Sequence, residues 1–205
     1  MLLDLIKLNE KYDLNIKGVL HIGAHFGQEF STYENLGIKN IIFFEPLPNT
    51  FNRLKENMIG KDVKLINTAL GNVIGEIEMN VETANEGQSS SILKPQIHLQ
   101  QYPHIRFNDK ITVQITKLDT FIEEKDKYNF INIDVQGYEL EVFKGGSEFL
   151  KTIDYIMTEV NRDEVYENCA KIEELDEFLS SYGFVRVETT WDGGTWGDAF
   201  YKKLK

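Results

Sequence analysis

The sequence predicts an α/β domain with a mainly parallel sheet, helices on both faces of that sheet, and an antiparallel hairpin at the C-terminus. Residues 18–45 read as strand, tight loop, helix and second strand. A second buried strand, beginning near Phe130, is followed directly by polar residues. The connection between the last two strands, residues 188–198, is rich in glycine and too short for a helical crossover. Those two strands should therefore pair antiparallel.

The N-terminal unit carries the first functional signal. The apolar run 19–22 meets a small-residue turn at 23–27, and the next apolar run ends in Glu45. An acid about 20 residues beyond the glycines can accept hydrogen bonds from both ribose hydroxyls. The spacing from Gly23 to Gly27 lacks the middle glycine of dinucleotide-binding loops. We therefore expect an adenosine-type ligand without a pyrophosphate, with a purely structural tight turn as the alternative interpretation.

Apolar periodicity predicts the remaining elements. They are a helix containing Phe51, Leu54 and Met58; strands at 63–66, 74–81 and 111–115; a short helix opening at 118–122; a helix beginning near Gly137; a strand at 153–160; a helix at 172–179; and strands at 184–187 and 199–202. We interpret residues 1–205 as a single domain, with a short amphipathic helix within residues 1–15. Residues 82–108 show no clear period, which predicts a loop or lid on the acceptor side.

Composition narrows the class of partner. The chain holds 33 acidic against 22 basic residues, a formal net charge of -11. This charge disfavours nucleic acid and anionic membrane surfaces and favours a neutral or small acceptor. No apolar run approaches the length of a membrane span, so we expect a soluble, cytoplasmic protein. The single cysteine, Cys169, is expected to be a small buried side chain, and the oligomeric state is not predicted.

Two strands deliver carboxylates to one edge of the predicted sheet. Asp134 ends one buried strand and Glu159 ends the next, so parallel strands would place them side by side. Such a pair disfavours double ionisation, and we interpret Asp134 as the leading proton acceptor with Glu159 beside it. Magnesium held by the same two carboxylates is possible but not favoured. Asp134 could instead cap the following helix, and Glu139 is expected to be a charge on that helix's surface.

Other side chains are weaker candidates. His25, in the loop after the first strand, could act as a base near neutral pH. Trp191 and Trp196 could form an aromatic wall for a sugar, or pack the hairpin against the core. Further residues that could contact acceptor or share the carboxylate site are His98, His104, Ser89 to Ser91 and Asn161.

Five blocks in order give the chain a family resemblance. They are IGAHFGQE with FFEPLPNTFNRLKEN; TALGNVIGEIEMN with SSSIL; TKLDTFI; INIDVQGYELEVFKGG; and GFVRVE with GDAFYKK. On these blocks, which run over nearly the whole chain, the sequence resembles the FkbM family of S-adenosylmethionine-dependent methyltransferases. The resemblance implies a seven-stranded, Rossmann-like class I fold. It also implies methyl transfer to an acceptor, usually a hydroxyl oxygen of a small molecule or glycan.

The resemblance also implies roles for particular residues. Gly23, Ala24 and Gly27 would approach the methionine part of the cofactor, Glu45 with Pro46 behind it would hold the ribose, Asn67 and Ala69 would lie near the adenine, and Asp134 would face the cofactor as well as the acceptor. One position departs from the family, which commonly has an acid where this chain has His21. A protonated histidine there would repel the cofactor's ammonium and sulfonium groups. This departure motivates one alternative, a binding module that keeps the fold and has lost catalysis. A nicotinamide-dependent oxidoreductase is a further, weaker alternative.

Overall fold

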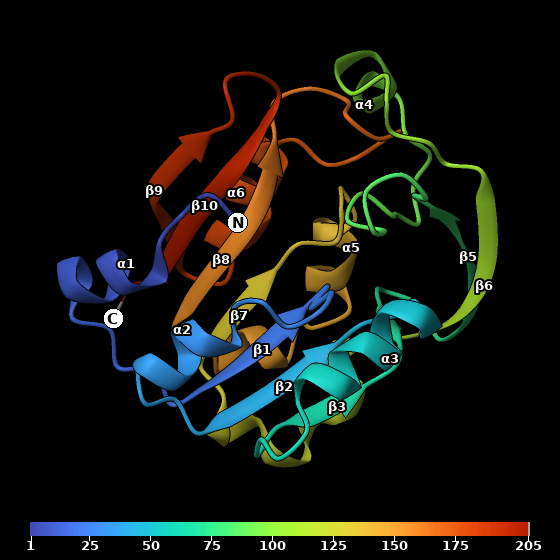
Figure 1. Ribbon diagram of the computed structural model, residues 1–205. Coiled ribbons are helices and arrows are strands. Elements are labelled where there is room, and N and C mark those ends of the chain that lie inside the picture. Colours follow the sequence, from blue (N-terminus) through green and yellow to red (C-terminus); the bar gives the residue numbers. More distant parts are fainter. Residues whose placement is uncertain (205) are drawn as a thin grey trace.

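The computed structural model describes residues 1–204, and of residues 122–124 only the backbone. Its centre is a seven-stranded sheet in the order β3-β2-β1-β7-β8-β10-β9 (Figure 1). The strands are β1 (Gly18–Ile22), β2 (Asn40–Phe44), β3 (Lys64–Ile66), β7 (Phe130–Ile133), β8 (Tyr155–Asn161), β9 (Phe184–Trp191) and β10 (Trp196–Lys203). The first five in this order are parallel, whereas β10 runs antiparallel to β8 and β9. The predicted fold class is confirmed.

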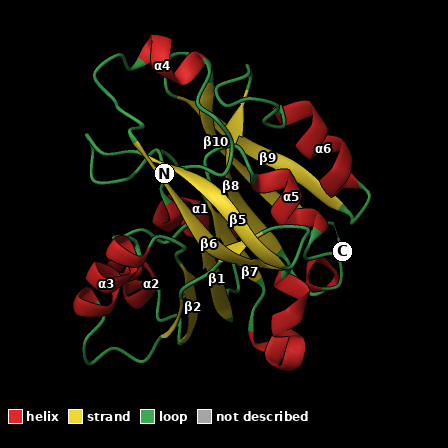
Figure 2. Ribbon diagram, turned by 90° about the vertical axis from the view of Figure 1, so that its right-hand side faces the viewer, coloured by secondary structure: helices red, strands yellow, loops and turns green. Residues whose placement is uncertain are grey.

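Helices cover both faces of the sheet, with α2 and α3 on one side and α5 and α6 on the other (Figure 2). The helices are α1 (Leu5–Tyr12), α2 (Phe30–Asn35), α3 (Pro48–Asn57), α4 (Ile97–Gln101), α5 (Glu139–Lys144) and α6 (Ile172–Ser180), with 3₁₀ helices η1 (Leu118–Lys127) and η2 (Phe149–Lys151). Successive strand residues point to opposite faces, so Val19 of β1 joins the core beneath α1–α3 and Leu20 joins the core beneath α5 and α6. Both faces of β1 are therefore buried.

A second, three-stranded sheet stands beside the first and has the order β4-β6-β5. It consists of β4 (Ala69–Leu70), β5 (Gly75–Val81) and β6 (Asp109–Thr116), and β5 pairs antiparallel with β6, as the alternation at 74–81 predicts. The segment 82–108 leaves β5, bridges Ser91 back to Asn80 and Pro95 across to Tyr166, and includes α4. It thus runs from the small sheet to the loop after β8.

The C-terminal hairpin is longer than the sequence pattern predicts. Trp191 is the last residue of β9 and Trp196 is the first residue of β10, so neither tryptophan lies in the connection between the strands. The predicted helix at 118–122 is a 3₁₀ helix that continues to Lys127. Cys169 is buried, with 5% of its surface exposed. Within residues 1–204, the helices are all too short or too polar to span a bilayer.

Candidate active site

Two cavities lie where β1, β2, β7 and β8 end, the edge at which doubly wound sheets bind ligands. The smaller has a volume of about 60 Å³ and the larger about 490 Å³. The residues that line both cavities are Gly23, His25, Gln88, Asp134 and Gln136. These residues come from the loops after β1 and β7 and from segment 82–108. The two compartments therefore share one wall, and that wall is mostly polar.

The loop after β1 is held between its two neighbouring strands. The backbone N–H of Gly23 donates to the carbonyl of Phe44 at the end of β2, at 3.0 Å. Gly23 has φ +80°, and a Cβ there would lie 1.9 Å from the backbone oxygen of Asp134. Only glycine allows this close approach between the loops after β1 and β7. The fold thus requires a glycine at position 23, and the absence of a side chain there leaves room in the cavity wall.

The other predicted cofactor residues are not all at the cavities. Among them, Ala24 lines the larger cavity, and Pro46 and Ala69 line the smaller one. The Asn67 amide instead donates to the backbone oxygens of Glu45, at 2.8 Å, and Pro46, at 3.0 Å. It therefore holds the loop after β2 in place. Gly27 faces α3, where an added Cβ would lie 2.6 Å from Met58 Cε. The absence of a side chain at Gly27 therefore allows the loop after β1 to pack closely against α3.

Glu45 follows β2 and is 5% exposed in the wall of the smaller cavity. Its Oε2 accepts from the N–H of His25 at 3.0 Å and its Oε1 from the N–H of Leu47 at 2.9 Å. Burial raises the pKa of Glu45 to about 7, although both hydrogen bonds favour the ionised form. Each carboxylate oxygen keeps a second acceptor position, which suits the hydroxyl pair of a ribose.

The structure brings Asp134 and Glu159 together at the ends of β7 and β8. The amide nitrogen of Gln136 donates to Asp134 Oδ1 at 2.7 Å and to Glu159 Oε2 at 2.8 Å. The Gln136 oxygen accepts from the hydroxyl of Tyr166 at 2.7 Å, which fixes the orientation of the amide. Burial, and then the charge of Asp134, hold the pKa of Glu159 well above its ordinary value. The sequence pattern did not indicate the bridging role of Gln136.

Two predictions for this stretch are wrong. Asp134 does not cap α5, whose N-cap residue is Tyr138 and has no side-chain cap. Glu139 is not a surface charge, because it is 2% exposed and accepts from the N–H groups of Val135 at 3.0 Å and Gly137 at 3.2 Å. Burial raises the pKa of Glu139 to about 7. The carboxylate braces the tight turn after β7, where an inward-facing N–H requires an acceptor.

Oxygens of Asp134, Glu139 and Glu159 lie within 4.8 Å of one another, close enough to be considered as a metal site. The Glu139 oxygen in hydrogen-bond contact already accepts from two backbone N–H groups. The other two carboxylates share the Gln136 amide nitrogen as donor. A divalent cation would have to displace that nitrogen, so the donor arrangement fits a hydrogen-bonded pair better than a cation site.

His21 is buried, with 3% of its surface exposed. Asn132 Nδ2 donates to the hydroxyl oxygen of Tyr33 at 2.6 Å, which leaves that hydroxyl to donate to His21 Nδ1 at 3.0 Å. Burial lowers the pKa of His21, so the ring is neutral at neutral pH and carries its proton on Nε2. Nε2 lies 3.9 Å from the carboxylate of Glu29, which also lines the larger cavity. The predicted repulsion of a cationic cofactor by His21 does not arise.

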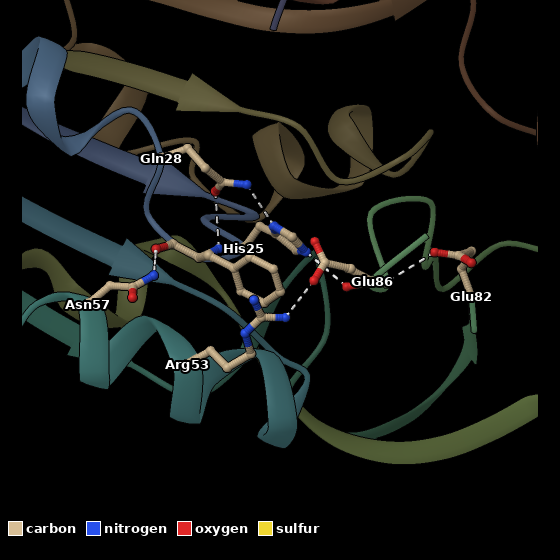
Figure 3. Close-up of polar contacts among 8 residues, drawn as sticks. His25, Gln28, Arg53, Asn57, Glu82 and Glu86 are labelled. Carbon is tan, nitrogen blue, oxygen red and sulfur yellow. Dashed lines mark hydrogen bonds and ion pairs between the residues drawn. The ribbon is translucent and has the colours of Figure 1, made fainter. Parts of the chain in front are cut away.

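His25 holds segment 82–108 against the loop after β1 (Figure 3). Gln28 Nε2 donates to His25 Nδ1 at 2.9 Å, which places the ring proton on Nε2, and Nε2 donates to the Glu86 carbonyl at 3.0 Å. The Glu86 carboxylate pairs with Arg53 at 2.9 Å, and the Arg53 guanidinium lies 3.7 Å from the centre of the Phe26 ring. Both nitrogens of His25 are engaged, so this geometry does not support His25 as a base.

The outer half of the larger cavity lies between segment 82–108 and the C-terminal hairpin. Its aromatic and polar residues are Ser89, His98, Tyr102, His104, Asp192 and Trp196. Trp196 Nε1 donates to the Tyr102 hydroxyl at 2.8 Å, and that hydroxyl donates to Asp192 at 3.4 Å. Trp191 is not among the lining residues and packs under the guanidinium of Arg162. Of the two predicted wall tryptophans, Trp196 alone is placed in the cavity.

His98 is 5% exposed within this outer half. Its Nε2 contacts Ser89 Oγ at 3.1 Å, and its Nδ1 has no hydrogen-bond partner among the described residues. Asn161, which the sequence places near Glu159, is also buried, and its side-chain amide is likewise unpartnered within residues 1–204. Burial lowers the pKa of His98, so its ring is neutral near neutral pH.

The seven-stranded sheet with its antiparallel end and its cavities at the strand ends defines a class I, Rossmann-like methyltransferase fold. Residues 21–186 match the family model for the methyltransferase FkbM domain, and the chain belongs to the FkbM methyltransferase family. It is 30% identical over 196 residues to the 2-O-methyltransferase NoeI of Sinorhizobium fredii, covering 91% of this chain and 79% of that protein. It is 27% identical over 124 residues to the hexuronic acid methyltransferase AglP of Haloferax volcanii, covering 60% of this chain and 47% of that protein.

Solved structures agree with the fold. TrmK from M. capricolum, in complex with S-adenosyl-homocysteine, has a TM-score of 0.54 at 12% identity, covering 100% of this chain and 70% of that one. The magnesium protoporphyrin IX methyltransferase ChlM from Synechocystis, with bound SAM, has a TM-score of 0.53 at 8% identity, covering 98% of this chain and 76% of that one. Membership of the family excludes the nicotinamide-dependent interpretation.

Proposed function

We propose that this protein methylates a hydroxyl oxygen of a sugar or glycan acceptor, with S-adenosylmethionine as the methyl donor. The observation that carries the proposal is the meeting of the two cavities at Asp134. One compartment has the lining of a nucleoside site, and the other has aromatic and polar walls suited to a sugar. The names of the two curated relatives, a 2-O-methyltransferase and a hexuronic acid methyltransferase, support this reaction class.

The residues present suit the cofactor. Apolar side chains that would face an adenine line the smaller cavity, namely Leu47, Ala69, Leu70, Met79 and Ile92, and Glu45 would accept from the ribose hydroxyls. Acids that would face the cofactor's cationic groups line the larger one, namely Glu29, Asp134 and Glu159. When bound, S-adenosylmethionine supplies an electrophilic methyl group on a sulfonium sulfur, which departs as a neutral thioether.

The chain's own contribution is to orient the acceptor and receive its proton. Asp134 lines both cavities, so its carboxylate can accept a hydrogen bond from an acceptor hydroxyl beside the cofactor. As the hydroxyl oxygen forms its bond to the methyl carbon, the hydroxyl proton passes to Asp134. Gln136 holds this carboxylate in place, and Glu159, with its raised pKa, provides a protonated neighbour that does not compete for the proton. No step in this scheme requires a metal ion.

Segment 82–108 acts in this proposal as a lid. The smaller cavity, about 60 Å³, is below the roughly 300–1,000 Å³ of typical ligand pockets. Its walls include Gly87, Gln88 and Ser90 of this segment. A nucleoside can therefore bind only if these residues move outward. Outward movement of the segment would break the contacts of Glu86 with His25 and Arg53.

Methyl transfer by the Asp134→Asn variant tests the assignment. With purified protein, labelled S-adenosylmethionine and a panel of methyl glycosides, we expect the variant's kcat to fall by about 10²–10⁴. The control variant Asp126→Asn changes an exposed acid of η1 and should keep the wild-type rate. Unchanged turnover in Asp134→Asn would refute its role in accepting the proton. A rate that collapses in excess EDTA would contradict the metal-free scheme.

A further inference from the structure

The lining of the larger cavity contains more acidic than basic groups. Acids line the cavity from its floor to its rim, with Glu29, Asp134 and Glu159 inside and Asp192 at the exposed rim. Among the described residues, the lining includes no lysine or arginine side chain, but it does include Met1. Burial lowers the pKa of the Met1 ammonium, whereas the charges of Asp134, Asp198 and Glu29 raise it, and the pKa is raised overall, so this cation lies among the acids at the floor. The two buried histidines add no positive charge near neutral pH, because burial lowers the pKa values of His21 and His98. The rim, where Asp192 lies, therefore holds an acid with no lysine or arginine beside it in the described lining.

The rim acid lies beside the aromatic wall. Asp192 accepts from the Tyr102 hydroxyl, and that hydroxyl is itself held by Trp196 Nε1. Tyr102 and Trp196 also supply the flat apolar surface on which a sugar ring can stack. Thr195 Oγ1 donates to Gln101 Oε1 at 2.9 Å, which ties the hairpin to the end of α4 beside this wall. The aromatic wall and the carboxylate thus form one built subsite at the mouth of the cavity.

An acceptor that carries a carboxylate would meet this subsite unfavourably. At the rim, its charge would lose hydration without gaining a lysine or arginine partner from the described lining, and it would approach the like charge of Asp192. The chain's net charge of -11 adds a long-range repulsion. An uncharged sugar avoids these penalties, and the ammonium of an amino sugar could pair with Asp192. Specificity between otherwise similar sugars then comes from the repulsion as much as from the contacts.

We propose that the subsite formed by Tyr102, Asp192 and Trp196 selects acceptor sugars that are uncharged or carry an amino group, and excludes those that carry a carboxylate. The inference rests on the proposed sugar methylation and specifies its acceptor. It also distinguishes this chain from its relative AglP, whose name gives a hexuronic acid as substrate.

Matched glycosides test the inference. Methyl glucoside, its 2-amino-2-deoxy analogue and its uronic acid differ in charge on the same ring, and the galacto and manno series repeat the comparison. We expect kcat/KM for the neutral and amino sugars to exceed that for the uronic acid by about tenfold or more. The variant Asp192→Lys should reduce the ratio of kcat/KM between the neutral sugar and the uronic acid by about tenfold. The change should come from a lower KM for the uronic acid, not from its kcat.

Asp62→Lys is the matched control. Asp62 is exposed and precedes β3, at the opposite edge of the sheet from the subsite. The substitution Asp62→Lys therefore changes the net charge by the same amount as Asp192→Lys without contacting the subsite. It should leave the ratio between acceptors unchanged. A uronic acid that is the best acceptor of the wild type would overturn the inference. Equal narrowing by Asp62→Lys would overturn the assignment to Asp192, because the effect would then come from net charge.

Binding separates this inference from the proposed function. Ligand-observed NMR with the S-adenosylhomocysteine-loaded protein gives the order of affinity for the same three glycosides without turnover. If the neutral and amino sugars bind more tightly than the uronic acid but no methyl is transferred, the subsite stands and the proposed reaction fails. If none of the three binds in any ring series, the subsite inference is wrong.

Discussion

Protonation of Glu45 should control nucleoside affinity near neutral pH. Burial raises the pKa of this carboxyl to about 7 in the protein without ligand. A ribose hydroxyl that donates to Glu45 stabilises the ionised form, so binding lowers this pKa and releases a proton. Ionisation precedes productive binding, and the affinity therefore rises as pH increases through about 7.

The magnitude follows from the pKa alone. A carboxyl with a pKa of about 7 is about one-tenth ionised at pH 6 and about nine-tenths ionised at pH 8. If the bound form is fully ionised over this range, the dissociation constant falls by about tenfold, or about 1.4 kcal/mol, between these two pH values. At pH 7, about half a proton should be released for each ligand bound.

The ligand that isolates Glu45 is 5′-methylthioadenosine, which keeps the nucleoside and lacks both the charged sulfonium and the amino acid. Its binding does not report on the acids of the larger cavity. Calorimetry at pH 6, 7 and 8, in two buffers with different ionisation enthalpies, gives the dissociation constant and the proton count together. The amide in Glu45→Gln cannot ionise, so the pH slope should vanish.

Folding stability should also fall in Glu45→Gln. The amide has one acceptor oxygen in place of two, so its NH₂ would face either the N–H of His25 or that of Leu47. An unpaired buried donor costs about 1–3 kcal/mol. Glu56→Gln, which changes an exposed acid on α3, should behave as the wild type. A flat pH profile in the wild type, or an equal slope in Glu45→Gln, would refute the role of this carboxyl.

Two further variants address the bridge between the strand ends and the lid contact. In Gln136→Asn, the shorter amide tolerates the left-handed backbone but cannot reach both carboxylates. Urea unfolding should therefore show a free energy of unfolding lower by about 2–4 kcal/mol, against about 1 kcal/mol for the control Tyr166→Phe. Equal losses in the two variants would contradict the bridging role of Gln136. Arg53→Ala removes an exposed ion pair with Glu86, so stability should change by less than about 1 kcal/mol. Stopped-flow fluorescence should nevertheless show faster release of S-adenosylhomocysteine from Arg53→Ala. The control Lys61→Ala, which removes a similar ion pair away from the lid, should release it at the wild-type rate. Equal release rates in the two variants would contradict a role of the Arg53–Glu86 pair in holding the lid.

The strands of the N-terminal unit and the antiparallel C-terminal pair could be predicted from sequence because their signals are local. The apolar run before Gly23, the acid at position 45 and the short connection after β9 each report on their own neighbourhood. The placement of Asp134 beside Glu159 then required only that their strands be parallel and adjacent. Local pattern and sheet topology were sufficient for these features.

The errors came from contacts that no local pattern contains. Glu139 has the position of a first-turn surface acid, yet it turns inward because the N–H groups of the turn after β7 need an acceptor. The cofactor role of Gly27 stays a prediction, and the structure adds a packing reason for a glycine there, since an added Cβ would lie 2.6 Å from Met58 Cε, far along the chain. Glu29 was missed for the same reason, since only the fold brings its carboxylate to within 3.9 Å of His21 Nε2.

Gln136 connects the strand ends to the lid, and this has a consequence for the order of events. Its side-chain oxygen accepts from Tyr166, whose hydroxyl also contacts the Ser89 carbonyl at 2.9 Å, and its backbone oxygen accepts from Ser91 Oγ at 2.7 Å. Outward movement of residues 89–91 would break the Ser91 bond and loosen the amide that orients Asp134. We therefore expect the proton acceptor to be positioned only after the lid has closed over the cofactor. A variant that opens the lid should therefore alter the pH profile of methyl transfer as well as cofactor release, whereas a lid that only retains the cofactor would leave that profile unchanged.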